Sequence, residues 1–166
     1  MDWGISKGVI NGYKDGTFKP NQKVTEAEFL KMMVRVYEPT LSSSKGENWT
    51  EAYYKRAREL RYPVKSYSDM ASRKKVILRK QVAELISSSE GVNFSGNDAI
   101  HYLLAFGIAA GSNPNEVTIE SFKGDKALTR AEAVKFVKNL SEYGIGGLLE
   151  RPSERSNPND LPPIRR

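Results

Sequence analysis

One local sequence pattern occurs twice in this chain, and this repetition constrains the fold more than any other feature. Thr25-Glu26-Ala27-Glu28 returns as Thr129-Arg130-Ala131-Glu132, and in both copies a phenylalanine, Phe18 or Phe122, lies seven residues before the threonine. A third, weaker copy lies between them, in which Arg79 matches Arg130 and Ile77 matches Leu128. Units of this kind cannot bury their apolar faces alone, so we expect them to pack on one another.

The repetition divides the chain into three units and a tail. The apolar anchors Val24, Ile77 and Leu128 are 53 and 51 residues apart, which sets a unit length of about fifty residues. Apolar residues recur at helical spacing after each anchor, so each unit is expected to be helix, loop, helix, and the fold mainly α. The expected divisions are a first unit at 1–38 that lacks its first helix, a middle unit at 49–90, a third unit at 95–143 and an extended C-terminal tail at 144–166.

The repeated threonine and glutamate form the sequence of a capping box. Thr25 with Glu28, and Thr129 with Glu132, can each satisfy free N–H groups at a helix start, which explains these positions structurally. Arg130 and Arg79 are less simple, because the helix dipole disfavours a cation in the first turn. One explanation is an anion held by the guanidinium together with free backbone N–H groups. The other is that both side chains point to water.

With these motifs in view, the stretch WGISKGVINGYKDGTFKPNQKVTEAEFLKMMVRVY (residues 3–37) resembles an S-layer homology motif. The hallmarks of that family are a Gly-Tyr-x-Asp-Gly-Thr-Phe-x-Pro turn and a Thr-Arg-Ala-Glu helix start. The first unit has the whole turn, the third has Leu-Thr-Arg-Ala-Glu intact, and the middle unit keeps the apolar frame and the arginine. The resemblance covers about residues 1–143.

The resemblance implies three helix–loop–helix repeats in a pseudo-threefold arrangement around a central helical bundle. It also implies a noncatalytic module at the cell surface or cell wall, which binds an anionic, pyruvylated wall polysaccharide in grooves between neighbouring repeats. A carboxylate of that kind can be held bidentately by a guanidinium. The site residues carried over in this way are Arg130, Thr129, Glu132, Arg79, Gly111, Gly12 and Asp15.

The sequence departs from the family pattern at two helix starts. Glu26 stands where the family has arginine, and Leu78 stands where it has threonine. We therefore expect Arg130 to be the strongest anion contact, Arg79 the next and Glu26 the weakest. Replacing Arg130 with alanine is expected to weaken binding and leave the fold intact, whereas Glu26→Arg is expected to preserve or improve binding.

Composition narrows the functional classes further. The chain has no cysteine and one histidine, so thiol chemistry, disulfides and His-rich metal sites are excluded, and no cofactor or catalytic group is expected. No apolar run approaches the roughly 20 residues of a membrane span, and the N-terminus has no secretion signal. The net charge of +6 favours an anionic partner.

Two alternatives of other classes remain open at this point. The chain could be a structural subunit of a larger assembly, a virion or a surface layer, that uses the scaffold for contacts with other protein subunits. The lack of a signal peptide also leaves a virion or intracellular location open. Its tail is expected to contact folded surface, its own or a neighbour's, through Leu148, Leu149 and Leu161. Nucleic-acid binding by the basic stretch 49–90 is the other alternative, which the lack of a recognised motif disfavours.

Overall fold

The computed structural model describes residues 2–10, 16–43, 45–46, 48–65, 70–109 and 117–164. The expectation of a mainly α fold is confirmed, since the described residues form helices joined by turns and three isolated β-bridges. None of these helices combines the length and the apolar character needed to cross a membrane. The elements are α1 (Asp2–Ser6), α2 (Glu26–Tyr37), α3 (Glu51–Glu59), η1 (Ser72–Lys74), α4 (Arg79–Ser89), α5 (Gly96–Ala105), α6 (Ile119–Phe122), α7 (Arg130–Tyr143) and η2 (Pro158–Asp160).

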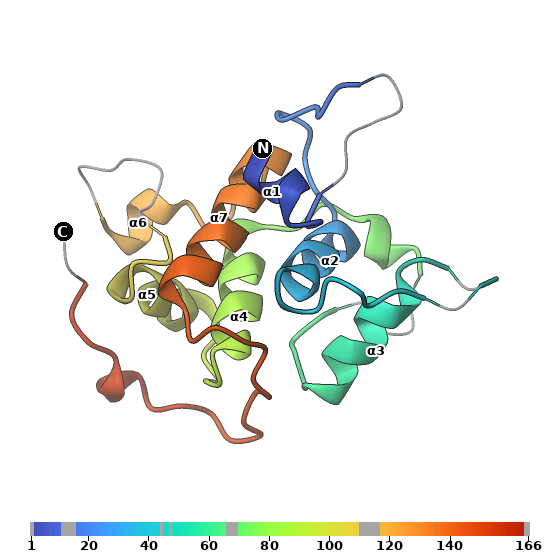
Figure 1. The fold of residues 1–166 in the computed structure, drawn as a ribbon. Helices are drawn as coiled ribbons and strands as arrows, with labels where there is room; N and C mark the ends of the chain where they lie inside the picture. The colour runs from blue at the N-terminus through green and yellow to red at the C-terminus, as the bar shows by residue number, and fades with distance from the viewer. Residues whose placement is uncertain are drawn as a thin grey trace.

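Three long helices, α2, α4 and α7, form the centre of the molecule, and shorter helices pack outside them (Figure 1). Outer helix α3 packs on α2, α5 packs on α4, and α1 packs on α7. The first unit therefore has a five-residue outer helix, α1, which packs on α7, and this corrects the expectation that the first helix is missing.

The same backbone hydrogen bond occurs at the start of all three central helices. The first helical N–H donates to a carbonyl oxygen that lies four residues before the start of the next central helix. The pairs are Glu26 N to Lys75 O (3.1 Å), Arg79 N to Lys126 O (2.9 Å) and Arg130 N to Gln22 O (2.8 Å). The anchors Val24, Ile77 and Leu128 lie beside these bonds and are buried. This cyclic pattern agrees with three pseudo-threefold repeats, while the unit boundaries given above remain a prediction.

The outer helices also end alike. Gly8, Arg61 and Gly107 each adopt a left-handed conformation, with φ of 68°, 62° and 76°. The residue after each donates its N–H to a carbonyl five residues back, as in Val9 to Gly4, Tyr62 to Ala57 and Ile108 to Leu103. This geometry suits glycine, because a side chain in that conformation meets the backbone. The middle segment uses an arginine there.

The two phenylalanines that flank the repeated pattern precede similar turns but differ in local structure and burial, since Phe122 is the last residue of α6 and Phe18 lies outside any helix. The next residue is left-handed in both copies, with φ of 45° at Lys19 and 57° at Lys123. Phe122 is fully buried and packs edge-on against Phe136 at 5.9 Å between ring centroids, whereas Phe18 is only half-buried. The expectation of two equally buried rings is therefore wrong for Phe18, which is only half-buried.

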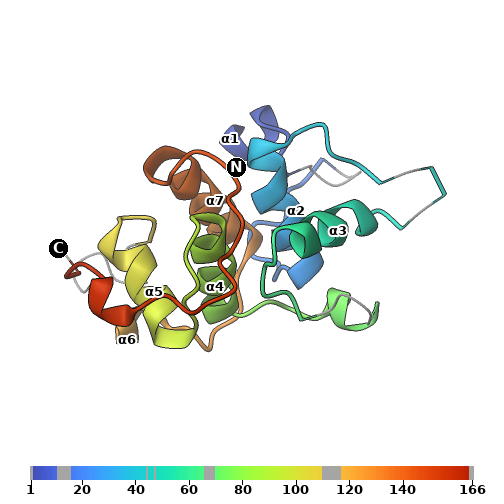
Figure 2. The same ribbon diagram turned by 90° about the horizontal axis from the view of Figure 1, so that it is seen from below.

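The C-terminal tail lies on the body of the protein in both views (Figures 1 and 2). Leu148 and Leu161 pack against the core, which confirms that the tail contacts folded surface, here its own domain. The side chain of Leu149 is 41% exposed and lies over Gly91, and its backbone also contacts the body, with its N–H on Ser89 O (2.9 Å) and its carbonyl accepting from the Tyr62 hydroxyl (2.8 Å). Further along, Arg151 N donates to Leu60 O (2.9 Å) and Ser156 N to Asn93 O (3.0 Å).

Candidate functional site

Arg79 and Arg130, the arginines singled out from the sequence, are buried, with exposed fractions of 6% and 7%. Their Nε atoms donate to the carbonyl oxygens of Phe122 (2.7 Å) and Phe18 (2.8 Å). Each arginine therefore reaches from the start of its own helix to the turn that precedes the next central helix. Neither points to water, which corrects the simpler of the two expectations.

Each arginine also faces the glutamate that caps that next helix. Arg79 Nη1 lies 2.7 Å from Glu132 Oε2, and Arg130 Nη1 lies 3.7 Å from Glu28 Oε2. The other oxygen of each glutamate accepts the N–H of its own cap threonine, so both expected capping boxes are confirmed. Burial opposes ionisation of Glu132, but hydrogen bonds from Thr129 and the charge of Arg79 lower its pKa.

The helix starts offer no unused N–H groups at the positions where an anion was expected. The N–H groups of Arg79 and Arg130 donate in the backbone bonds described above. At the next position of each helix, Lys80 N donates to Gly124 O (2.9 Å) and Ala131 N to Pro20 O (3.0 Å). The expectation of an anion held by the arginine together with free N–H groups is therefore wrong for α4 and α7. Carbonyl and carboxylate oxygens of the adjoining unit offset the cost of a cation in the first turn.

Glu26, the residue at the equivalent position of α2, is also internal. It is 6% exposed, and its carboxylate accepts the Tyr54 hydroxyl (2.8 Å) and the Lys65 N–H (3.0 Å). A cation at this position would face two hydrogen-bond donors. The expectation that Glu26→Arg restores a binding residue is therefore corrected, because this position supports the fold.

Two open grooves lie beside these helix starts, and they are built from equivalent segments. Each combines the start of one central helix, the segment at or just before the start of the following outer helix, and the turn before the following central helix. The α4 groove, of about 740 Å³, is lined by Lys80, Gly96, Asn97, Ile100, Ile119, Glu120, Lys123, Gly124, Asp125 and Lys126. The α2 groove, of about 180 Å³, is lined by Thr25, Ala27, Glu28, Asn48, Trp49, Thr50, Met70, Arg73 and Lys74.

Lysines dominate the rim of the α4 groove. Lys123 and Lys126 are exposed, and Lys80 Nζ pairs with Asp125 at 3.0 Å, where the carboxylate side chain is 90% exposed. The turn approaches α4 so closely that a Cβ on Gly124 would lie 3.2 Å from Lys80 Cβ. This close approach brings the three lysines together around one opening.

The α2 groove carries an aromatic platform instead. Trp49 is 47% exposed, and Lys31 Nζ lies 5.3 Å from its ring centroid. Arg73 is buried there: it bonds to Thr50 Oγ1 (3.0 Å) and Glu51 Oε1 (2.6 Å), and its guanidinium lies 4.1 Å from the ring centroid of Tyr54. Its charge is thus compensated inside the protein, and the exposed cation of this groove is Lys74.

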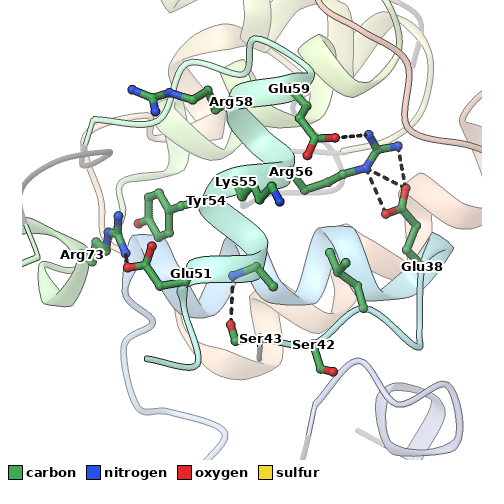
Figure 3. A pocket seen from close by; sticks show the side chains of 12 residues that line it. Glu38, Ser42, Ser43, Glu51, Tyr54, Lys55, Arg56, Arg58, Glu59 and Arg73 are labelled. Atoms are coloured by element: carbon green, nitrogen blue, oxygen red, sulfur yellow. Dashed lines mark hydrogen bonds and ion pairs between the residues drawn. The ribbon is translucent and has the colours of Figure 1, made fainter. Parts of the chain in front are cut away.

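A third depression, of about 800 Å³, lies over α3 and is shown in Figure 3. Arg56 dominates one wall, where Glu38 holds its guanidinium through contacts of 2.9–3.1 Å and Glu59 lies 3.2 Å away. The ion pair of Arg73 with Glu51 lies at the other wall. Arg56 and Arg73 are therefore matched by carboxylates, and Lys55 and Arg58 also line the depression.

The same compensation extends over the basic stretch 49–90, where the sequence has ten lysines and arginines against five acids. Arg56, Arg61, Arg73, Arg79 and Lys80 all form ion pairs, so half of these cations are matched. The described residues contain no group of three or more potential metal ligands, and the single histidine, His101, contacts Pro162 O at 2.7 Å.

Three of the residues carried over from the resemblance, Gly12, Asp15 and Gly111, lie outside the described residues. Conversely, sequence reasoning missed Lys80, Lys123 and Lys126. One signal was available for Lys123, since a lysine follows the repeated phenylalanine in both copies.

Comparison with known families gives one match. Residues 1–30 match the model of the S-layer homology domain, a segment that runs from α1 through the first turns of α2. The resemblance is thereby confirmed for this segment, and it supports a noncatalytic surface-binding module in general. No curated protein matches the chain.

Proposed function

We propose that this chain is a noncatalytic module that holds an anionic cell-wall glycan in its α4 groove, with the α2 groove as a second, weaker site. The single observation that carries the proposal is the convergence of the exposed Lys123 and Lys126 on one opening, beside a helix start whose own charges, including that of Lys80, are matched by carboxylates. The family match at residues 1–30 supports binding at a cell surface. A pyruvylated sugar is the anion that we propose.

The dimensions and lining of the α4 groove suit a sugar. Its volume of about 740 Å³ falls within the usual range of small-ligand sites. Ile100 and Ile119 provide an apolar surface for the C–H face of a ring, and the lysines provide cations for its carboxylate. Lys123 is held in a left-handed conformation, a kind of local strain that recurs in binding sites.

In this proposal Arg79 and Arg130 hold the turns that border the grooves and do not contact the glycan. Arg79 fixes the carbonyl of Phe122, the residue before Lys123, while Thr129 and Glu132 fix the helix start on the other side of that turn. Arg130 does the same for the turn after Phe18. For Gly12, Asp15 and Gly111 the proposal is the glycan-binding part that the resemblance implies.

The test is sedimentation of purified protein with native walls and with walls stripped of their secondary polymer. The parent should pellet with native walls only. Lys123→Glu/Lys126→Glu should lose at least about tenfold in affinity, since two charge-assisted contacts are each worth roughly 1.5–3 kcal/mol.

Lys135→Glu/Lys138→Glu on α7 is the matched control, because it changes the net charge equally at residues that line neither groove. Equal binding by both variants would overturn the assignment of the α4 groove. Pelleting of the parent with stripped walls would overturn the glycan itself.

The structural-subunit alternative depended on a tail that needs another molecule to hold it. Because residues 144–164 pack on their own domain, no neighbouring subunit is required for their order. The nucleic-acid alternative depended on a free basic surface, and the ion pairs of the middle stretch reduce that surface. Both observations favour the glycan-binding proposal, with a location at the cell surface.

A further inference from the structure

A separate cavity of about 510 Å³ lies at the other end of α4, between the body and the tail. The tail forms one wall and the ends of α4, α5 and α7 form the rest. Its lining residues are Glu90, Val92, Phe94, Tyr102, Phe106, Tyr143, Gly144, Ile145, Ser156, Asp160, Leu161 and Pro162. These residues belong to neither groove of the proposed function.

Aromatic rings make up much of this lining. Phe94, Tyr102 and Phe106 form a continuous row, with centroid separations of 6.2 Å and 4.6 Å. Two of the four rings are open to solvent, since Phe106 is 47% and Tyr143 62% exposed. An accessible ring face carries partial negative charge and attracts cations.

The cavity also contains a buried carboxylate. Glu90 is 5% exposed, and its Oε2 accepts the Ile145 N–H at 2.8 Å. Gly144 passes so close that an added Cβ would lie 2.9 Å from the same oxygen. Among the residues that the structure describes, no lysine, arginine or histidine pairs with Glu90, and burial raises the pKa of this carboxyl. Buried carboxylates in proteins are normally paired.

The charge of the lining is opposite to that of the whole chain. The described lining holds two carboxylates, Glu90 and Asp160, and no lysine or arginine, whereas the chain carries a net charge of +6. From the aromatic row, the unpaired carboxylate and this local reversal of charge, we propose that the cavity binds a small quaternary ammonium ion. A primary ammonium needs three hydrogen-bond acceptors, but a quaternary one needs only ring faces and a nearby negative charge.

The test is titration of the protein with choline, followed by NMR at the Ile145 amide that contacts Glu90. The neutral isostere 3,3-dimethylbutan-1-ol is the first comparator and ethanolamine, a primary ammonium, is the second. Choline should bind at least about tenfold more tightly than either, and the Ile145 amide signal should shift. Equal affinity for choline and the neutral alcohol, or for choline and ethanolamine, would overturn the proposal, as would no binding of choline.

Substitutions test whether choline binds in this cavity or elsewhere on the surface. Glu90→Gln should abolish the preference for choline over the neutral alcohol, and Phe106→Ala should weaken choline severalfold without disturbing the fold, because that ring is half exposed. Glu154→Gln is the matched control: it removes an exposed tail carboxylate outside the cavity and should leave choline binding unchanged. Unchanged binding in Phe106→Ala, with thermal melts verifying the fold, would overturn the site even if Glu90→Gln failed to fold.

Discussion

Replacement of Glu26 gives the sharpest test of how the helix starts are built. Its carboxylate accepts two donors, the Tyr54 hydroxyl at 2.8 Å and the Lys65 N–H at 3.0 Å, and Tyr54 lies under the guanidinium of buried Arg73. Burial and the hydrogen bond to Glu26 raise the pKa of Tyr54 well above its usual range, so the hydroxyl stays protonated and donates.

The expected cost follows from these contacts. Glu26→Ala leaves the two donors without their acceptor, which costs about 1–3 kcal/mol for each group that stays desolvated, or roughly 2–6 kcal/mol together. For a domain of this size each kcal/mol shifts the melting temperature by about 2–4 °C, so we expect a decrease of roughly 4–24 °C. Glu26→Arg should cost more, because it adds a second buried cation beside Arg73.

Thermal melts and urea unfolding followed by circular dichroism measure these differences. Glu26→Gln should lie between the parent and Glu26→Ala, since the amide keeps one acceptor oxygen. Glu142→Ala is the control: this glutamate makes only a 4.0 Å helical ion pair with Lys138, so its loss should change stability by less than about 0.5 kcal/mol. The reasoning is refuted if Glu26→Arg melts within about 2 °C of the parent.

Three further results are expected from the same kind of measurement. Arg130→Ala should lower the free energy of unfolding by about 1–3 kcal/mol in urea titrations, because the Phe18 carbonyl loses its donor, and unchanged stability would contradict the buried placement of Arg130. Arg61→Gly should raise the melting temperature, because glycine adopts the left-handed conformation of Arg61 without the backbone strain of about 1 kcal/mol. A lower melting temperature would count against that strain. The folded-state pKa of Glu132 is lowered, so its contribution is present above the unfolded pKa and lost as pH falls. The parent should therefore lose more stability than Glu132→Gln between pH 7 and about pH 3.5, and equal losses would exclude this linkage.

Local features were predictable because their causes lie within a few residues of each other. A threonine with a glutamate three positions later satisfies the same two N–H groups in any context, so the caps at Thr25 and Thr129 follow from the sequence. The mainly α fold follows likewise from apolar residues at helical spacing. Recurrence of the pattern also predicted that units pack together.

The orientation of the arginines was not predictable in this way, because their partners are distant in the chain. Arg79 and Arg130 bind carbonyls 43 and 112 residues away. A cation in the first turn of a helix is a local cost, and the sequence alone does not say whether solvent, a ligand or the protein offsets it. The tail is similar: its composition favours an extended peptide, and only tertiary contacts such as Leu149 N to Ser89 O explain its order.

The identity of the residue at each helix start follows from the backbone group that it meets. Arg79 and Arg130 face carbonyl oxygens, which require a donor, and both positions carry a guanidinium. Glu26 faces the N–H of Lys65, which requires an acceptor, and this position carries a carboxylate. Glu26 therefore departs from the arginine of the family pattern where the side chain meets N–H and O–H donors in place of a carbonyl oxygen. In all three cases the side chain at the helix start contacts a segment that is distant in the chain, which supports a role for this position in joining neighbouring units.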